Sequence, residues 1–134
     1  MSRHAAVLLS ALALGACSSG NKGAEPDPNI FPASYRQEII LTLTNTLDDP
    51  TGIRDAFISE PVLRAAGREP RYVVCMRFNS RDMNKQYSGV KDRIAFFYAG
   101  HLNQMVDATK EQCGAAAYKP WPELEKYCLA TSCK

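Results

Sequence analysis

The spacing of apolar residues beyond position 33 predicts one helix followed by several strands. Over residues 34–47 an apolar residue recurs at every fourth position, which is typical of a helix that packs one face against a core. The stripe consists of Tyr35, Ile39, Leu43 and Leu47. Ser34 and Gln37 form a capping-box pattern at the start of this helix. Pro50 ends it, because the residue before a proline avoids helical geometry.

Alternation of apolar and polar residues predicts the strands. They are expected over residues 53–58, 72–79, 93–99 and 102–106. Residues 93–99 are apolar on both faces, so this strand should lie inside the sheet and be covered on both sides. Gly100 and His101 can form the tight turn that follows it. Residues 60–71 contain two prolines and a glycine and are expected to be irregular.

The two faces of the strand at 72–79 predict how the chain is layered. One face carries Tyr72, Val74, Met76 and Phe78, whereas Cys75 lies on the other, more polar face. The helix should cover the first face, and a C-terminal segment with a short helix from about Pro122 to Leu129 should cross the second. The expected fold class is α+β, with a three- to four-stranded antiparallel sheet between an N-terminal helix and a disulfide-stapled C-terminal segment.

The first residues of the chain carry an export pattern. Arg3 precedes an apolar run of 12 residues from Ala5 to Ala16. A helix of that length spans about 18 Å, whereas a bilayer core is about 30 Å thick. The run therefore fits the apolar part of a signal peptide, residues 1–16, which is removed on export.

The run ends in Leu14-Gly15-Ala16-Cys17, which resembles the lipobox of bacterial lipoproteins. The resemblance implies that the thiol of Cys17 receives a diacylglyceryl group and that a peptidase cuts before this residue. The protein would then be held in the cell envelope by lipid. Ser18 resembles the outer-membrane sorting signal of lipoproteins of enterobacterial type, which favours the periplasmic face of that membrane over the inner membrane. The alternative is an ordinary secretory signal that is cut at another bond.

The rest of the chain divides into a tether and one domain. Residues 17–33 begin with the lipidated cysteine and are rich in serine, glycine and proline, which is typical of a linker. A flexible chain of about 15 residues reaches roughly 20 Å, enough to hold a domain clear of a membrane. Residues 34–134 are expected to form a single globular α+β domain.

Four cysteines remain once Cys17 is assigned to the lipid. They are Cys75, Cys113, Cys128 and Cys133. An even number in an exported chain indicates two disulfides, with three connectivities open. The favoured pairing joins the first with the second and the third with the fourth. No CxxC pair is present and His101 is the only histidine after the leader, so neither a metal nor another cofactor is expected.

Three short motifs resemble small exported bacterial proteins and lipoproteins of uncharacterised function. They are Asp49-Pro50-Thr51, Val73-Val74-Cys75 and Tyr87-Ser88-Gly89. The likeness covers roughly residues 35–100 and implies no activity.

The charge pattern argues against a nucleic-acid partner. The chain has 16 basic and 14 acidic residues, a formal net charge of +2. Basic residues between Arg54 and Arg93 alternate with acidic ones, which is typical of a mixed solvated surface.

Recognisable catalytic patterns are missing from the sequence. A nucleophilic triad needs a base, and the one candidate, His101, lies in an expected turn. None of the 14 carboxylates is marked as part of a pair across a sugar cleft. Ser88-Gly89 matches the start of the S-G-x-x-Y loop of small periplasmic lysozyme inhibitors, but Asp92 replaces a tyrosine in the sequence that follows.

The polar segment 80–92 is the expected contact surface, because binding residues concentrate on loops above rigid sheets. Its candidate residues are Arg77, Arg81, Asp82, Lys85 and Tyr87. The expected function is a non-enzymatic lipoprotein that contacts another envelope protein or cell-wall material such as peptidoglycan. Two alternatives stay open: an envelope hydrolase with an atypical site, and a lysozyme-type enzyme inhibitor.

Overall fold

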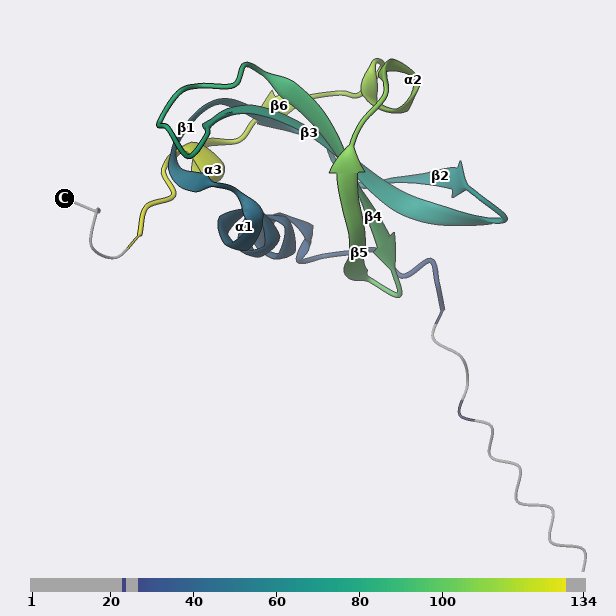
Figure 1. Cartoon of the computed structure of the whole chain (residues 1–134). Coiled ribbons are helices and arrows are strands. Elements are labelled where there is room, and N and C mark those ends of the chain that lie inside the picture. Colours follow the sequence, from purple (N-terminus) through teal and green to yellow (C-terminus); the bar gives the residue numbers. More distant parts are fainter. Residues whose placement is uncertain (1–22, 24–26, 130–134) are drawn as a thin grey trace, which may run out of the picture.

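An antiparallel sheet forms the body of the protein in the computed structural model, which describes residue 23 and residues 27–129 (Figure 1). The elements are α1 (Tyr35–Thr46), β1 (Asp49–Ile58), β2 (Val62–Ala66), β3 (Glu69–Arg81), β4 (Lys91–Tyr98), β5 (His101–Asp107), α2 (Lys110–Cys113), β6 (Lys119–Pro120) and α3 (Pro122–Glu125). The predicted signal peptide, Cys17, most of the tether and Cys133 lie outside the described residues.

Helix α1 lies in the hollow of the curved sheet, as Figure 1 shows. The predicted apolar stripe is confirmed: Tyr35, Ile39 and Leu43 are buried against side chains of β1, β3 and β4. The predicted capping box is wrong, because the side chain of Ser34 makes no capping hydrogen bond. Ser34 has φ −97° and ψ 21° instead of the extended geometry that a side-chain cap needs.

The sheet has six strands in the described residues, more than the three or four expected, in the order β5-β4-β3-β1-β6 with β2 also on β3. The additional strands come mainly from residues 60–71, which were expected to be irregular. They form β2 and the start of β3, joined by a two-residue turn at Gly67 and Arg68. The two prolines are compatible with these strands because of where they lie. Pro61 comes before β2, and Pro70 is the second residue of β3 after the turn.

Strand β3 carries two neighbours on one edge. Its second half pairs with β1, where Ile58 faces Met76, and its first half pairs with β2, where Val62 faces Val73. Ser59 closes the junction between the two: its backbone N–H donates to the Cys75 carbonyl at 2.8 Å, and its hydroxyl accepts from the Cys75 N–H at 2.9 Å. A buried serine thus keeps the backbone of β3 hydrogen-bonded across the break.

The two faces of β3 build two cores, as the alternation predicted. The face with Val74, Met76 and Phe78 belongs to the core beneath α1. On the opposite face Val73 and Cys75 pack with Ile94 and Cys113.

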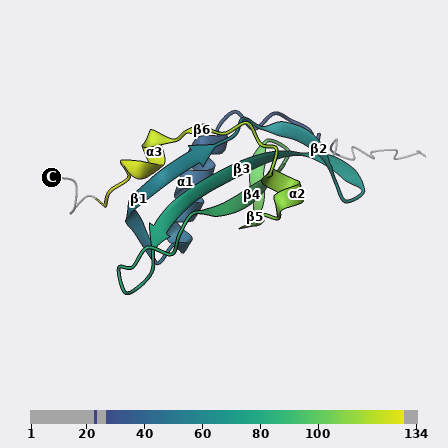
Figure 2. The same ribbon diagram turned by 90° about the horizontal axis from the view of Figure 1, so that it is seen from above.

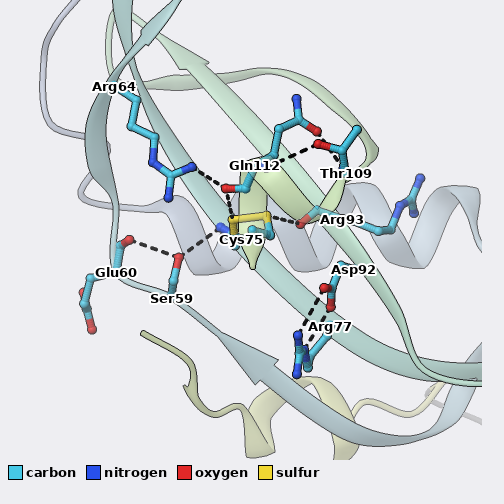
Figure 3. The surroundings of a disulfide bond; sticks show 10 residues. Ser59, Glu60, Arg64, Cys75, Arg77, Asp92, Arg93, Thr109 and Gln112 are labelled. Atoms are coloured by element: carbon cyan, nitrogen blue, oxygen red, sulfur yellow. Dashed lines mark hydrogen bonds and ion pairs between the residues drawn. A yellow bond between two sulfur atoms is a disulfide. The ribbon is translucent and has the colours of Figure 1, made fainter. Parts of the chain in front are cut away.

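A disulfide joins Cys75 of β3 to Cys113 of α2, which confirms this half of the expected pairing. Figure 3 shows the bond with α2 above it, where Arg64 donates to the Gln112 carbonyl. Thr109 and Gln112 form a capping box that starts α2. Cys128 is also disulfide-bonded; its expected pairing with Cys133 stays a prediction.

The C-terminal segment covers the back of the sheet only in part, which corrects the expected layering. After α2 it reaches the edge of the sheet, where β6 pairs with β1 and the Trp121 N–H donates to the Ala56 carbonyl at 2.9 Å (Figure 2). Trp121 and Leu124 are fully buried in the same core as α1. Burying these large apolar side chains brings α3 to the helix side of the sheet.

None of the helices in residues 27–129 is long and apolar enough to cross a membrane. The longest, α1, has 12 residues.

The disulfide should contribute strongly to stability. It closes a loop with a sequence separation of 38, for which the chain-entropy model gives about 4 kcal/mol. We expect Cys75→Ala/Cys113→Ala to lower the free energy of unfolding by about 3–4 kcal/mol, measured by urea unfolding with Trp121 fluorescence. A loss below about 1 kcal/mol would mean that α2 is held mainly by its other contacts.

The β4–β5 turn contains a strained residue. The turn is Ala99-Gly100, one position earlier than expected, with φ +50° and +82°, the pattern of a type I′ turn. Alanine is unfavourable at positive φ, whereas asparagine tolerates it. Ala99→Asn should therefore raise the free energy of unfolding by about 0.5–1 kcal/mol in thermal or urea unfolding, and Ala99→Val should lower it.

Candidate functional site

The loop between β3 and β4, residues 82–90, is fastened to the start of β1 by an ionic cluster. Its centre is Asp49, which is only 3% exposed. One carboxylate oxygen, Oδ2, lies 3.0 Å from both Arg81 Nη2 and Lys85 Nζ. The other, Oδ1, accepts hydrogen bonds from the Thr51 N–H at 3.0 Å and the Thr51 hydroxyl at 2.6 Å. The buried carboxylate of Asp49 therefore links the start of β1 to Arg81 at the end of β3 and to Lys85 in the loop.

These contacts stabilise the charged form of the carboxyl group. The hydroxyl of Thr51, the ammonium of Lys85 and the charge of Arg81 hold the pKa of Asp49 well below its usual range. Burial alone would raise this pKa, so the hydrogen bonds and the two cations outweigh desolvation.

Tyr87 adds a second connection between the loop and β1. Its hydroxyl donates to the Gly52 carbonyl at 2.6 Å. The guanidinium carbon of Arg54 lies 3.7 Å from the ring centroid, within cation–π distance. Arg81 approaches the same ring at 6.0 Å and donates to the hydroxyl of Thr51 at 3.2 Å.

The loop also has an internal frame. Oδ1 of Asp82 accepts from the N–H groups of Asn84 and Gln86 at 2.8 and 3.0 Å. The Gly89 N–H donates to the side chain of the buried Asn79 at 2.9 Å. Lys85 has φ +62°, an unfavourable conformation for a residue with a side chain, which its contact with Asp49 helps to hold. The loop is thus ordered by its own residues as well as by β1.

Exposed apolar and cationic side chains lie on and beside this loop. Met83 is 79% exposed, Val90 is half-exposed, and the ring of Tyr87 is in contact with Arg54 and, at a greater distance, with Arg81. We call Arg54, Met83, Lys85, Tyr87 and Val90 the loop platform. Tyrosine, methionine and arginine are enriched in protein interfaces, so the platform has the composition of a contact surface.

A hollow of about 280 Å³ lies next to the platform on the helix side. Leu47 and Asp48 form one wall, Arg81 and Gly89 another, and Arg93 lies at the sheet. A side chain or small group of a partner could enter it beside the loop.

Of the five residues predicted from the sequence, the structure brings four together. Arg81, Asp82, Lys85 and Tyr87 belong to the loop or to the cluster beneath it. Arg77 lies apart on the back of the sheet, where it donates to both oxygens of Asp92 at 2.9 and 3.1 Å (Figure 3). Its guanidinium carbon is 4.2 Å from the ring centroid of Tyr118, and burial raises the pKa of that tyrosine.

Asp49, Thr51 and Arg54 are the members of this site that the sequence did not suggest. The signal was an aspartate with a threonine two residues later, a frequent local hydrogen-bonding pattern. It was interpreted only as a turn after the helix. The cations that pair with Asp49, Arg81 and Lys85, are more than 30 positions away in the chain and could not be identified from spacing.

Two further hollows lie on the back of the sheet and were not predicted. One of about 500 Å³ extends from Arg64 across Phe96 to Gln104, and one of about 380 Å³ is bounded by Glu60 and Ala116. The side chain of Arg64 lines both.

The remaining candidate catalytic residue, His101, lies at the surface. His101 is exposed at the start of β5, and its Nδ1 lies 3.1 Å from Glu38 Oε1. In the described part of the chain, no three His, Cys, Asp or Glu side chains are grouped closely enough to hold a metal ion.

Loss of the charge on Asp49 should weaken folding in a pH-dependent way. The pKa of Asp49 is lower in the folded than in the unfolded chain, so its contribution is complete above the unfolded pKa of about 3.9 and is lost as pH falls below it. We expect Asp49→Asn to lower the free energy of unfolding by about 2–3 kcal/mol at neutral pH, and by less at acidic pH. Urea titrations at pH 7 and about pH 3 measure both values.

Asp55→Asn is the matched control for this prediction. Asp55 lies at the surface on the same strand, 3.9 Å from Arg54, and its replacement should change stability by less than about 0.5 kcal/mol. An Asp49→Asn protein with the stability of the control at both pH values would contradict the proposed role of the carboxylate.

Comparisons with protein-family models, with curated proteins and with solved structures yield no match for this chain. Its function therefore has to be inferred from its own residues.

Proposed function

We propose that this protein is a lipid-anchored lipoprotein of the bacterial cell envelope and that it acts as a non-enzymatic binding module. Its partner is another envelope protein or cell-wall material, and the loop platform makes the contact. The observation that carries this proposal is a loop that exposes apolar and cationic side chains and is held in place by the contacts of Lys85 and Arg81 with the buried Asp49.

Export is supported by two separate features. The Leu14-Gly15-Ala16-Cys17 pattern resembles a lipobox, and the disulfide between Cys75 and Cys113 is of the kind that persists in oxidising compartments. Ser18 supports the periplasmic face of the outer membrane as the location.

The arrangement of the fold suits display from a membrane. The continuous described chain starts at Asp27 next to the β4–β5 turn, where the Ala99 N–H donates to the Pro28 carbonyl at 3.3 Å. The loop platform follows the opposite end of β3, a strand of 13 residues that would extend about 40 Å if straight. Figures 1 and 2 show the loop and the tether end at opposite sides of the sheet. A lipid on Cys17 would thus leave the platform facing away from the membrane.

The rigidity of the loop favours binding. A loop that is ordered before binding loses less conformational entropy in the complex than a mobile one. The contacts of Asp49, Asp82 and Tyr87 hold the backbone in place, while Met83 and Val90 remain available.

Site-specific photocrosslinking in intact cells tests the proposal. We expect a photoreactive amino acid at Met83 to give a discrete crosslinked partner that mass spectrometry can identify. The control is the same amino acid at Leu41, which is 65% exposed on α1 and outside the platform. Equal products at both positions, or none at Met83, would contradict binding by the platform.

Mass analysis of the purified native protein tests the anchor separately. The expected N-terminus is Cys17 carrying a diacylglyceryl group. An intact Met1 without an acyl mass would overturn the envelope assignment.

A further inference from the structure

An apolar patch surrounds the point where the tether enters the domain. Ile30, Phe31 and Leu63 are 48%, 51% and 46% exposed. Tyr72 connects two of them, Phe31 and Leu63: its ring centroid is 5.4 Å from that of Phe31 in an edge-on arrangement, and it pairs with Leu63 across β2 and β3. We call these four residues the tether-end patch.

The patch is a fixed part of the domain. The Pro28 carbonyl accepts a hydrogen bond from the Ala99 N–H of the β4–β5 turn, and Pro32 is buried. Ile30 packs closely on Gly100, since a Cβ there would lie 3.1 Å from Cγ2 of Ile30. Because Pro28, Ile30 and Pro32 are anchored in this way, the half-exposed ring of Phe31 is held at the surface.

Positive charge borders the patch. The β2–β3 hairpin carries three arginines and one acidic residue, Glu69. Arg64 is turned to the back of the sheet, where it donates to the Gln112 carbonyl, and Arg71 pairs with Glu69 at 3.1 Å. Arg68 is exposed in the turn, and the guanidinium carbon of Arg71 lies 4.8 Å from the ring centroid of the half-exposed Tyr98. Aromatic rings with arginine beside them are typical of surfaces at the lipid headgroup level.

The chain length between the anchor and the patch is short. Nine residues lie between Cys17 and Asp27, so the two are at most about 35 Å apart. A lipid on Cys17 would therefore keep the tether-end patch close to the bilayer surface at all times. A weak surface contact becomes effective under such tethering, because the two partners cannot separate.

We infer that the tether-end patch is a second membrane contact, which rests Ile30, Phe31 and Leu63 on an anionic phospholipid surface while the exposed Arg68 of the β2–β3 turn faces the headgroups. This inference depends on the proposed lipid anchor. The membrane contact would also fix the orientation of the anchored domain: the tether end faces the bilayer, and the loop platform points away from it.

Depth-dependent fluorescence quenching tests the contact. The full mature protein with its lipid is reconstituted into vesicles of phosphatidylethanolamine and phosphatidylglycerol whose acyl chains carry bromine. We expect a Phe31→Trp variant to shift its emission to the blue and to lose about half of its added fluorescence, because its indole reaches the bilayer boundary. The wild-type signal of Trp121, which is buried, serves as the reference.

Met83→Trp is the matched control. It places the same probe on the loop platform, and we expect its emission to remain that of water-exposed indole without quenching by the brominated lipid. Equal quenching at the two positions would overturn the inference, since the domain would then have no preferred orientation.

Two other outcomes separate this inference from the anchor itself. If mass analysis shows the acyl group but Phe31→Trp is not quenched, the anchor stands and the membrane contact is wrong. A blue shift without quenching would also overturn it, because a protein would then cover the patch. If the acyl group is missing, the proposed anchoring fails first, and binding of the unlipidated protein to the same vesicles decides whether the patch has affinity for lipid.

Discussion

The backbone of β3 is the constraint on which the rest of the structure depends. This strand pairs with β1 and β2 on one edge and with β4 on the other, and its faces contribute to both cores. Such a strand can be continuous only if the break between β1 and β2 is filled, which Ser59 does with two hydrogen bonds to Cys75. The disulfide to Cys113 leaves from the same residue of β3. The hydrogen-bonded and covalent links of the sheet thus meet at one position.

The Asp49 cluster has a different role from the core. Replacing a buried ion pair by apolar residues is often neutral for stability, so a buried carboxylate with two cations is weak evidence for a stabilising role alone. What it does provide is geometry, since a single oxygen receives both Arg81 and Lys85 and therefore fixes a loop that has few apolar residues. A polar loop without such a centre would be mobile. We regard the cluster as the means by which an otherwise hydrophilic segment becomes a defined surface.

The proposals agree with one another in space. The loop platform and the tether-end patch lie at opposite ends of the sheet, and the length of β3 separates them (Figures 1 and 2). The proposed features would then lie along the direction of β3: the lipid anchor and the tether-end patch at one end, and the loop platform that faces a partner at the other. The hollows beside Arg64 are on the back of the sheet, lateral to that axis, and remain open to the solvent.

The sequence by itself determined the elements whose signals are local. The stripe of Tyr35, Ile39 and Leu43 predicted α1, and the alternation around Val74 and Cys75 predicted both faces of β3, because burial imposes periods of about four and two residues on helices and strands. The pairing of Cys75 with Cys113 was also favoured from the sequence. The lipobox pattern is local in the same sense, and it stays a prediction.

Only the tertiary structure decided the features that depend on distant residues. Residues 60–71 form strands despite Pro61 and Pro70, because β3 offers a free edge on which they can pair. Trp121 lies on the helix side of the sheet with α1, because β6 pairs with β1 at the edge of the sheet and brings the next residue into this core. Asp49 became the centre of the candidate site through cations brought to it from β3 and from the loop, and no spacing in the chain reveals such a meeting of charges. The periodicity of the sequence indicates which residues are buried, whereas the path of the folded backbone determines which distant residues contact one another.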